Sequence, residues 1–130
     1  MALIFKVGGN TISEQVRPFG LLFVRQSKDV ERLFEFSSGV GDIVSDEVTI
    51  DTEILWSFIA RLLQIIDGSN NRTMATLLGG YIAMAINLLR LAGAKSEFPG
   101  IEIASPIRVA LAELEGSPNL RPPRPKRSGL

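Results

Sequence analysis

The chain has 130 residues, a mass of 14.2 kDa and equal numbers of basic and acidic side chains, 14 of each. That size suits a single domain with a hydrophobic core of its own. Because the sequence contains neither cysteine nor histidine, it excludes a disulfide scaffold, a zinc finger, a Ser–His or Cys–His catalytic pair and a histidine pH switch.

The zero net charge conceals a difference between the body of the chain and its end. Residues 1–116 hold 10 basic and 14 acidic residues, a net charge of −4, whereas residues 117–130 hold four basic residues and no acid. We therefore divide the chain into one globular domain, 1–116, and an extended basic, proline-rich tail, 117–130. The apolar run after Met1 lacks the length and basic flank of a secretory signal, so we expect no cleaved signal and an intracellular or particle-associated location.

The beginning of the chain predicts a small β portion. Residues 2–7 favour a strand, because they are mostly apolar and β-branched or aromatic in part. Gly8 and Gly9 favour a turn, since glycine tolerates positive φ. Residues 11–17 favour a second strand, which we expect to end at Pro18.

The next segments are harder to assign. Residues 20–25 combine β-branched and aromatic side chains, so we predict another strand there. Residues 28–36 fit either a helix or a strand, and we favour a short helix with one apolar face. Residues 37–46 are rich in glycine and serine and predict a loop.

Two long helices are indicated in the second half of the domain. Asp51 is a good N-cap for a helix over 52–67, and Gly68 is a natural stop. Asn71 caps a second helix, over 72–92. Because the connection between them is short, we expect an antiparallel helical hairpin.

A short third helix completes the predicted domain. Ser105 followed by Pro106 is a strong helix start, and helical spacing continues to Glu115. Residues 101–103 resemble a short strand. The predicted fold class is therefore α+β, with a small N-terminal β portion packed on the helical hairpin and the third helix, followed by the extended C-terminal tail.

The helix over 72–92 admits three interpretations. It is a core helix of the domain, a membrane span, or an interface between copies of the chain, because two adjacent apolar helices exceed what a small sheet covers. An arginine in the span makes a membrane location costly. The interface hypothesis rests on a stripe of small and polar side chains that permits close approach: Thr76, Gly79, Gly80, Ala83, Asn87 and Arg90.

The tail carries a second set of candidate contacts. Its cations can neutralise phosphates without a folded motif, so we expect its partner to be nucleic acid, a membrane or the acidic body of a neighbouring copy. The pattern Pro-x-x-Pro-x-Arg over 122–127 also fits the grooves of SH3-type domains, which we rank below the phosphate interpretation. The cations are Arg121, Arg124, Lys126 and Arg127.

A group of carboxylates lies between residues 42 and 53. Paired carboxylates bind divalent ions, but the spacing here matches no calcium-binding loop. We interpret the group as a solvated acidic face that could also receive a basic tail. Its members are Asp42, Asp46, Glu47, Asp51 and Glu53.

These observations predict a non-enzymatic structural subunit. We find no convergent catalytic set, so we expect no catalytic residue, cofactor or metal. The predicted role is self-association or docking in a larger particle, such as a virion, with the tail contacting nucleic acid or a neighbouring subunit. The alternatives are a nucleic-acid-binding accessory protein that uses the tail, and a small membrane-associated protein.

Overall fold

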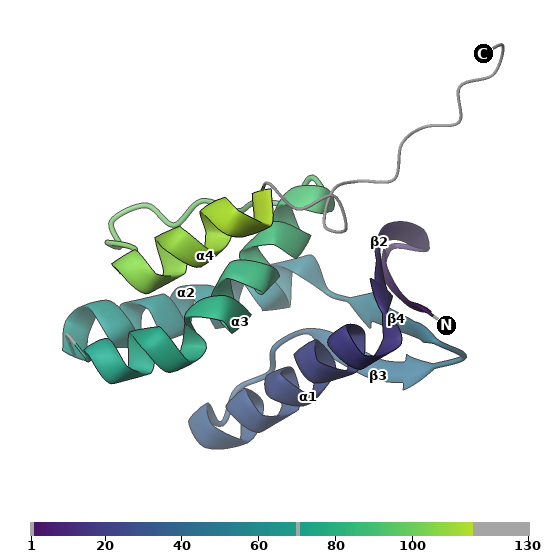
Figure 1. Ribbon diagram of the computed structural model, residues 1–130, viewed down its shortest axis with the longest axis horizontal. Helices are drawn as coiled ribbons and strands as arrows, with labels where there is room; N and C mark the ends of the chain where they lie inside the picture. Colours follow the sequence, from purple (N-terminus) through teal and green to yellow (C-terminus); the bar gives the residue numbers. More distant parts are fainter. Residues whose placement is uncertain (1, 70, 116–130) are drawn as a thin grey trace, which may run out of the picture.

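The computed structural model describes residues 2–69 and 71–115, and Figure 1 shows how their elements are arranged. The predicted tail, 117–130, lies outside the described residues. In chain order the elements are β1 (Ala2–Val7), β2 (Asn10–Val16), α1 (Arg17–Phe34), β3 (Val40–Val44), β4 (Glu47–Ile50), α2 (Thr52–Ser69), α3 (Arg72–Leu91) and α4 (Ser105–Glu115).

The four strands form one sheet in the order β2-β1-β4-β3. β1 pairs antiparallel with β2 and parallel with β4, and β3 pairs antiparallel with β4. The parallel pair requires a crossover, which α1 supplies between β2 and β3. Leu3, Phe5 and Val48 are fully buried, whereas Thr49 is exposed. Side chains alternate along a strand, so the sheet has one core-facing side and one solvated side.

The helices stack away from this sheet. α1 lies against it, α2 and α3 form a hairpin beside α1, and α4 packs on α3 on the side away from α1 (Figure 1). The α+β fold class is confirmed, as are the strands at 2–7 and 11–17, the helical hairpin and the third helix. Their ends differ from the predicted ones by one or two residues, which is the usual uncertainty at element termini.

The prediction of a strand over 20–25 is wrong, because these residues belong to α1. Pro18 stands in the first turn of that helix, where a missing N–H costs nothing, so it begins the helix instead of merely interrupting a strand. A Cβ on Gly20 would come within 2.9 Å of the Leu3 side chain, so glycine lets α1 approach the sheet closely. Buried residues recur along α1 at helical spacing and so form one side of it: Gly20, Phe23, Val24, Ser27 and Val30.

Two further predictions fail in the connecting segments. Residues 37–46 are not all loop, because β3 begins at Val40 and turns tightly into β4. Ser45 and Asp46 at that turn have φ of 52° and 61°, the left-handed conformation that tight hairpins require and that Asn-Gly usually provides. Residues 101–103 form no strand; they lie in the irregular segment between α3 and α4.

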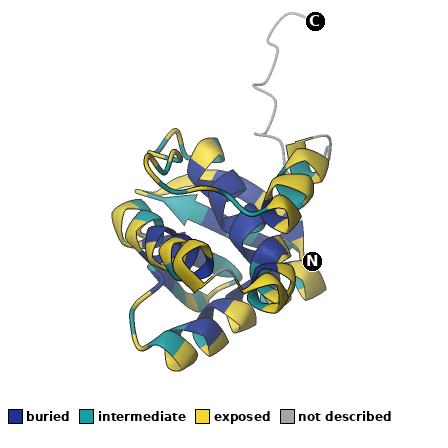
Figure 2. Cartoon of the chain, turned by 90° about the vertical axis from the view of Figure 1, so that its left-hand side faces the viewer, coloured by how far each residue is buried: buried dark blue, intermediate teal, exposed yellow. Residues whose placement is uncertain are grey.

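Figure 2 shows that the buried residues lie on the sides of the helices and the sheet that face one another. In this interior a buried polar contact joins α1 to α3. The Ser27 hydroxyl donates to the Phe23 carbonyl oxygen at 3.1 Å, so at its 2.8 Å contact with Tyr81 the tyrosine hydroxyl is the donor. The Tyr81 ring also stacks on Phe23, with centroids 5.2 Å apart. Burial raises the pKa of Tyr81 above its ordinary value, so the hydroxyl remains a donor at neutral pH.

We expect Tyr81→Phe to lower the free energy of unfolding by about 0.5–1.5 kcal/mol, the usual net value of one buried hydrogen bond. Ser27→Ala should cost a similar amount, and the double variant less than the two together, because both remove the same bond. Urea denaturation followed by circular dichroism measures all three. Strictly additive effects would show that the two hydroxyls are not energetically coupled.

Candidate interaction surface

The small residues of α3 that predict an interface between copies are partly used inside the chain. A Cβ on Gly79 would lie 3.4 Å from the backbone of Pro106, an ordinary van der Waals contact, so α4 leaves room there for a methyl group but not for a large side chain. Arg90, eleven residues later on the same side of the helix, forms an ion pair with Glu115 at the other end of α4. This side of α3 is therefore the contact between α3 and α4.

The predicted interface stripe needs a correction for three of its six residues. Gly79, Ala83 and Asn87 are buried, and Ala83 has no exposed surface at all. A second copy cannot reach these positions without displacing part of the chain that covers them. Thr76, Gly80 and Arg90 remain exposed.

The most exposed line of α3 overlaps the predicted stripe only at Gly80. Thr73, Leu77 and Gly80 are exposed and Met84 is half-buried, at spacings of four, three and four residues that keep them on one line. Leu77 is 76% exposed, an unusual value for a leucine on a helix that is otherwise largely core. This line lies between the side of α3 that faces α4 and the side that carries Tyr81 toward α1.

α1, which packs beside α3, also presents exposed apolar side chains. Phe19 is 67% exposed, Leu22 is 56% exposed and Leu33 is 76% exposed. Leu22 and Leu33 are separated by three helical turns, so they share one side of α1, and Phe19 lies one turn before Leu22. The opposite flank is charged and faces β3, since the Lys28 ammonium lies 3.4 Å from Asp42.

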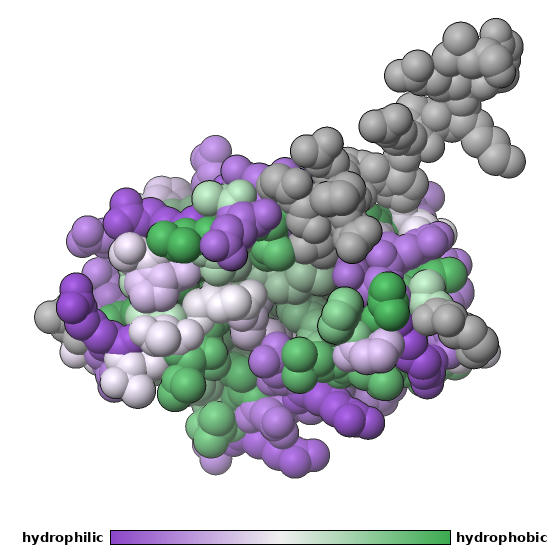
Figure 3. Space-filling view, viewed as in Figure 1, coloured by the Kyte–Doolittle hydropathy of each residue, from purple (hydrophilic) through white to green (hydrophobic). Residues whose placement is uncertain are grey.

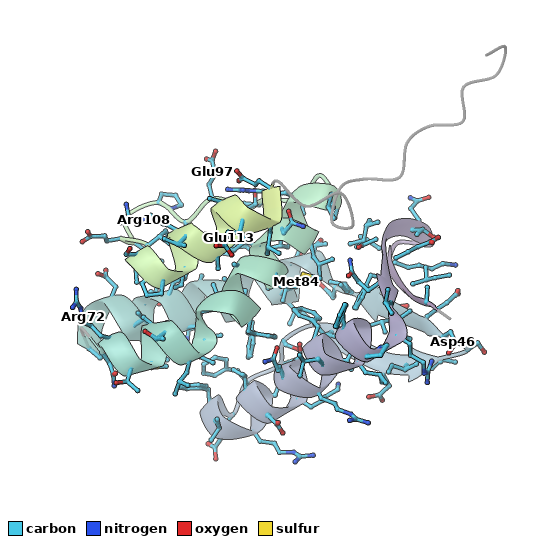
Figure 4. All side chains as sticks on the ribbon, viewed as in Figure 1. Asp46, Arg72, Met84, Glu97, Arg108 and Glu113 are labelled. Atoms are coloured by element: carbon cyan, nitrogen blue, oxygen red, sulfur yellow. The ribbon has the colours of Figure 1, made fainter. Side chains whose placement is uncertain are left out.

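We call these six residues the α1–α3 face: Phe19, Leu22, Leu33, Leu77, Gly80 and Met84. In Figure 3 hydrophobic residues gather over the middle of this side of the molecule, with hydrophilic residues above and below. Figure 4 labels Met84 on α3 near the centre of the same view. The other exposed large apolar side chains of the described residues lie on other elements: Val16, Val44, Ile54 and Val109.

The acidic group of the sequence has local partners instead of a shared ligand. Asp42, Asp46 and Glu47 pair with Lys28, Arg17 and Lys6 respectively. Asp51 accepts a hydrogen bond from the Ile54 amide at 3.1 Å and caps α2, and Glu53 lies in the first turn of that helix. Among residues 2–69 and 71–115 no group of three or more acidic side chains could hold a metal ion.

The cavities of the described residues are open and mixed in character. One of about 630 Å³ lies where α3 and α4 begin, at the end labelled by Arg72 and Arg108 in Figure 4, but Asp67 and Glu102 also line it. Another, of about 230 Å³, lies beside Trp56, whose indole N–H donates to the Glu97 carbonyl oxygen. Neither selects one class of ligand by charge.

The burial of α3 tests the interpretation of this helix as a membrane span. Among the described residues this helix is long and apolar enough to cross a membrane, with a mean hydropathy of 1.5 over its most apolar window. Of that window, 56% is buried inside the chain. Burial within the domain therefore explains more than half of the apolar window that suggested a membrane span.

The comparisons with known proteins place the chain in a family and give no function. Residues 1–121 match the family of unknown function DUF6086, and the chain belongs to that family. The matched region includes the whole described domain and only the first tail cation, Arg121. Neither the curated proteins nor the solved structures contain a significant match.

The two neighbouring glycines of α3 give a matched test of this surface. We expect Gly79→Leu to lower the free energy of unfolding by about 1–3 kcal/mol, because the side chain would be forced into α4. Gly80→Leu should leave stability unchanged or raise it by up to about 1 kcal/mol, since its position is open and leucine favours a helix.

Urea denaturation at a protein concentration where the chain is monomeric measures both effects. Equal losses for the two variants would contradict the assignment of Gly79 to the α3–α4 contact and of Gly80 to the surface.

Proposed function

We propose that the protein is a structural subunit that assembles with another protein chain through the α1–α3 face. The observation that carries the proposal is that two adjacent helices present large apolar side chains that are each more than half exposed: Phe19, Leu22 and Leu33 on α1 and Leu77 on α3. Single exposed apolar residues are normal, but several of them on one side of two packed helices are typical of an interaction site.

The rigidity of the surrounding helices supports this proposal. The Tyr81–Ser27 hydrogen bond and the Phe23–Tyr81 stack fix α1 against α3, so both sides of the patch keep one arrangement. A preorganised surface loses little conformational entropy when a partner binds. The face is thus suited to a stable contact and not only to transient collision.

Measurement of molar mass tests the proposal directly. We expect light scattering to give a mass well above 14.2 kDa at moderate salt, and Leu77→Asp to return the mass toward that of one chain, since burying a carboxylate at the contact is costly. Val44→Asp is the control, because Val44 is 68% exposed on β3, away from this face.

The two variants must also be compared for folding by thermal unfolding, which should differ little from the unmodified chain because both positions are exposed. A chain that stays at 14.2 kDa at high concentration, or loses assembly equally in both variants, contradicts the proposal.

A second candidate function follows from the charge separation along the sequence. The net charge of −4 in residues 1–116 and the four cations after them favour a tail that contacts an anionic partner such as nucleic acid. Assembly through the helices and binding through the tail are compatible, and tails gathered on an assembly would bind with raised avidity.

We expect deletion of 117–130 to abolish binding to duplex DNA or to RNA in a filter or anisotropy assay. With the tail present, log K should fall with log salt by about 0.9 for each duplex phosphate neutralised. A matched variant replaces Arg121, Arg124, Lys126 and Arg127 with glutamine and keeps the prolines. Its binding should be lost as well, and retained binding would indicate recognition of the proline pattern instead of charge.

A further inference from the structure

Gly80 is unexplained by the fold of a single chain. It lies within α3, in helical conformation. Apart from its chain neighbours and the adjacent backbone of its own helix, a Cβ built on it would meet no atom of the described residues within 4 Å. Apart from proline, glycine is the least favourable residue for a helix interior. Gly79 lies against Pro106 of α4, whereas Gly80 faces no other element and leaves an open notch on the exposed line of α3.

The residues beside this notch have a size pattern that a second α3 can match. The exposed line reads Thr73, Leu77, Gly80 and Met84, and its midpoint falls between Leu78 and Gly79. A two-fold axis through that midpoint lays a second α3 antiparallel on the first. It places Leu77 of each copy opposite Gly80 of the other, and Met84 opposite Thr73, so that a large residue meets a smaller one at each level.

We propose that the partner of the α1–α3 face is a second copy of this chain, packed with its α3 antiparallel so that each Leu77 side chain fills the notch at Gly80 of the other copy. This inference rests on the proposed function and specifies its partner. Each residue pair occurs twice in such an isologous contact, so a single good fit contributes twice.

α1 fits the same axis. Tyr81 contacts Phe23 and Ser27, so that it lies level with the residues between them. Figure 1 shows α1 and α3 running in opposite directions, and the axis crosses α3 two to three residues before Tyr81. The corresponding point on α1 is two to three residues further along, between Ser27 and Lys28.

That point is equidistant in sequence from Leu22 and Leu33, the exposed leucines of α1. The axis derived from α3 therefore places Leu22 of one copy opposite Leu33 of the other. Between them it sets Asp29 opposite Gln26, an amide that can donate to the carboxylate, so no like charges face each other on this flank.

A double-mutant cycle on the full chain tests this register. Leu77→Ala removes the protruding side chain and Gly80→Leu fills the notch, so each alone should weaken dimerisation roughly tenfold or more. The double variant exchanges the large and small positions, and its dissociation constant should return to within about threefold of the unmodified chain. Sedimentation equilibrium measures the constants, and thermal unfolding verifies that each variant folds.

Cysteine pairing gives an independent readout, because the chain has no cysteine of its own. When Leu77→Cys and Gly80→Cys chains are mixed and oxidised, we expect the disulfide between the two variants to exceed either homodimeric product, since a disulfide needs Cα atoms within about 7 Å. Val44→Cys mixed with Gly80→Cys is the control and should give no preferred product.

The outcomes separate this inference from the proposed function. An assembly that Leu77→Asp dissociates, but that shows additive effects in the cycle and no preferred 77–80 disulfide, overturns the antiparallel pairing and leaves the proposed function standing. A chain that remains at 14.2 kDa throughout overturns both.

Discussion

The contact between α3 and α4 is the constraint on which the rest of the structure depends. α3 is apolar around most of its circumference, and such a helix is stable in water only when several elements cover it. α4 covers one side, where Pro106 lies against Gly79, α2 covers another through the hairpin, and the Tyr81–Ser27 bond holds α1 on a third. What these three helices leave uncovered is the narrow line through Leu77 and Gly80.

This arrangement accounts for most of the apolar helix surface that, from the sequence, exceeds what a small sheet covers. The excess is real, but the chain itself buries most of it, including Ile82 and Ala83. The part that remains on the proposed face lies on two helices instead of one, because α1 contributes Phe19, Leu22 and Leu33 and α3 contributes Leu77. A proposed partner therefore meets a broad surface, not a single seam, and broad surfaces are what stable protein contacts require.

The helical hairpin could be predicted because its signals are local: Asp51 and Asn71 cap their helices through hydrogen bonds to Ile54 and Met74. The candidate face could not, for two reasons. α1 contains β-branched and aromatic residues, and only its tertiary contacts and the helix-initiating position of Pro18 outweigh that preference. Gly79 and Gly80 are also equivalent in sequence, and only the position of α4 shows that one is interior and the other exposed.

The irregular outer strands of the sheet bear on how copies of this chain can meet. β2 and β3 form its two edges, and each pairs with its inner neighbour through a register that shifts partway along. Glu14 on one edge and Asp42 on the other are exposed charges. Bulges and charges at a strand edge discourage another chain from adding a strand there. These features disfavour fibre-like growth by sheet extension, and the contact that we propose between copies lies on the helices instead.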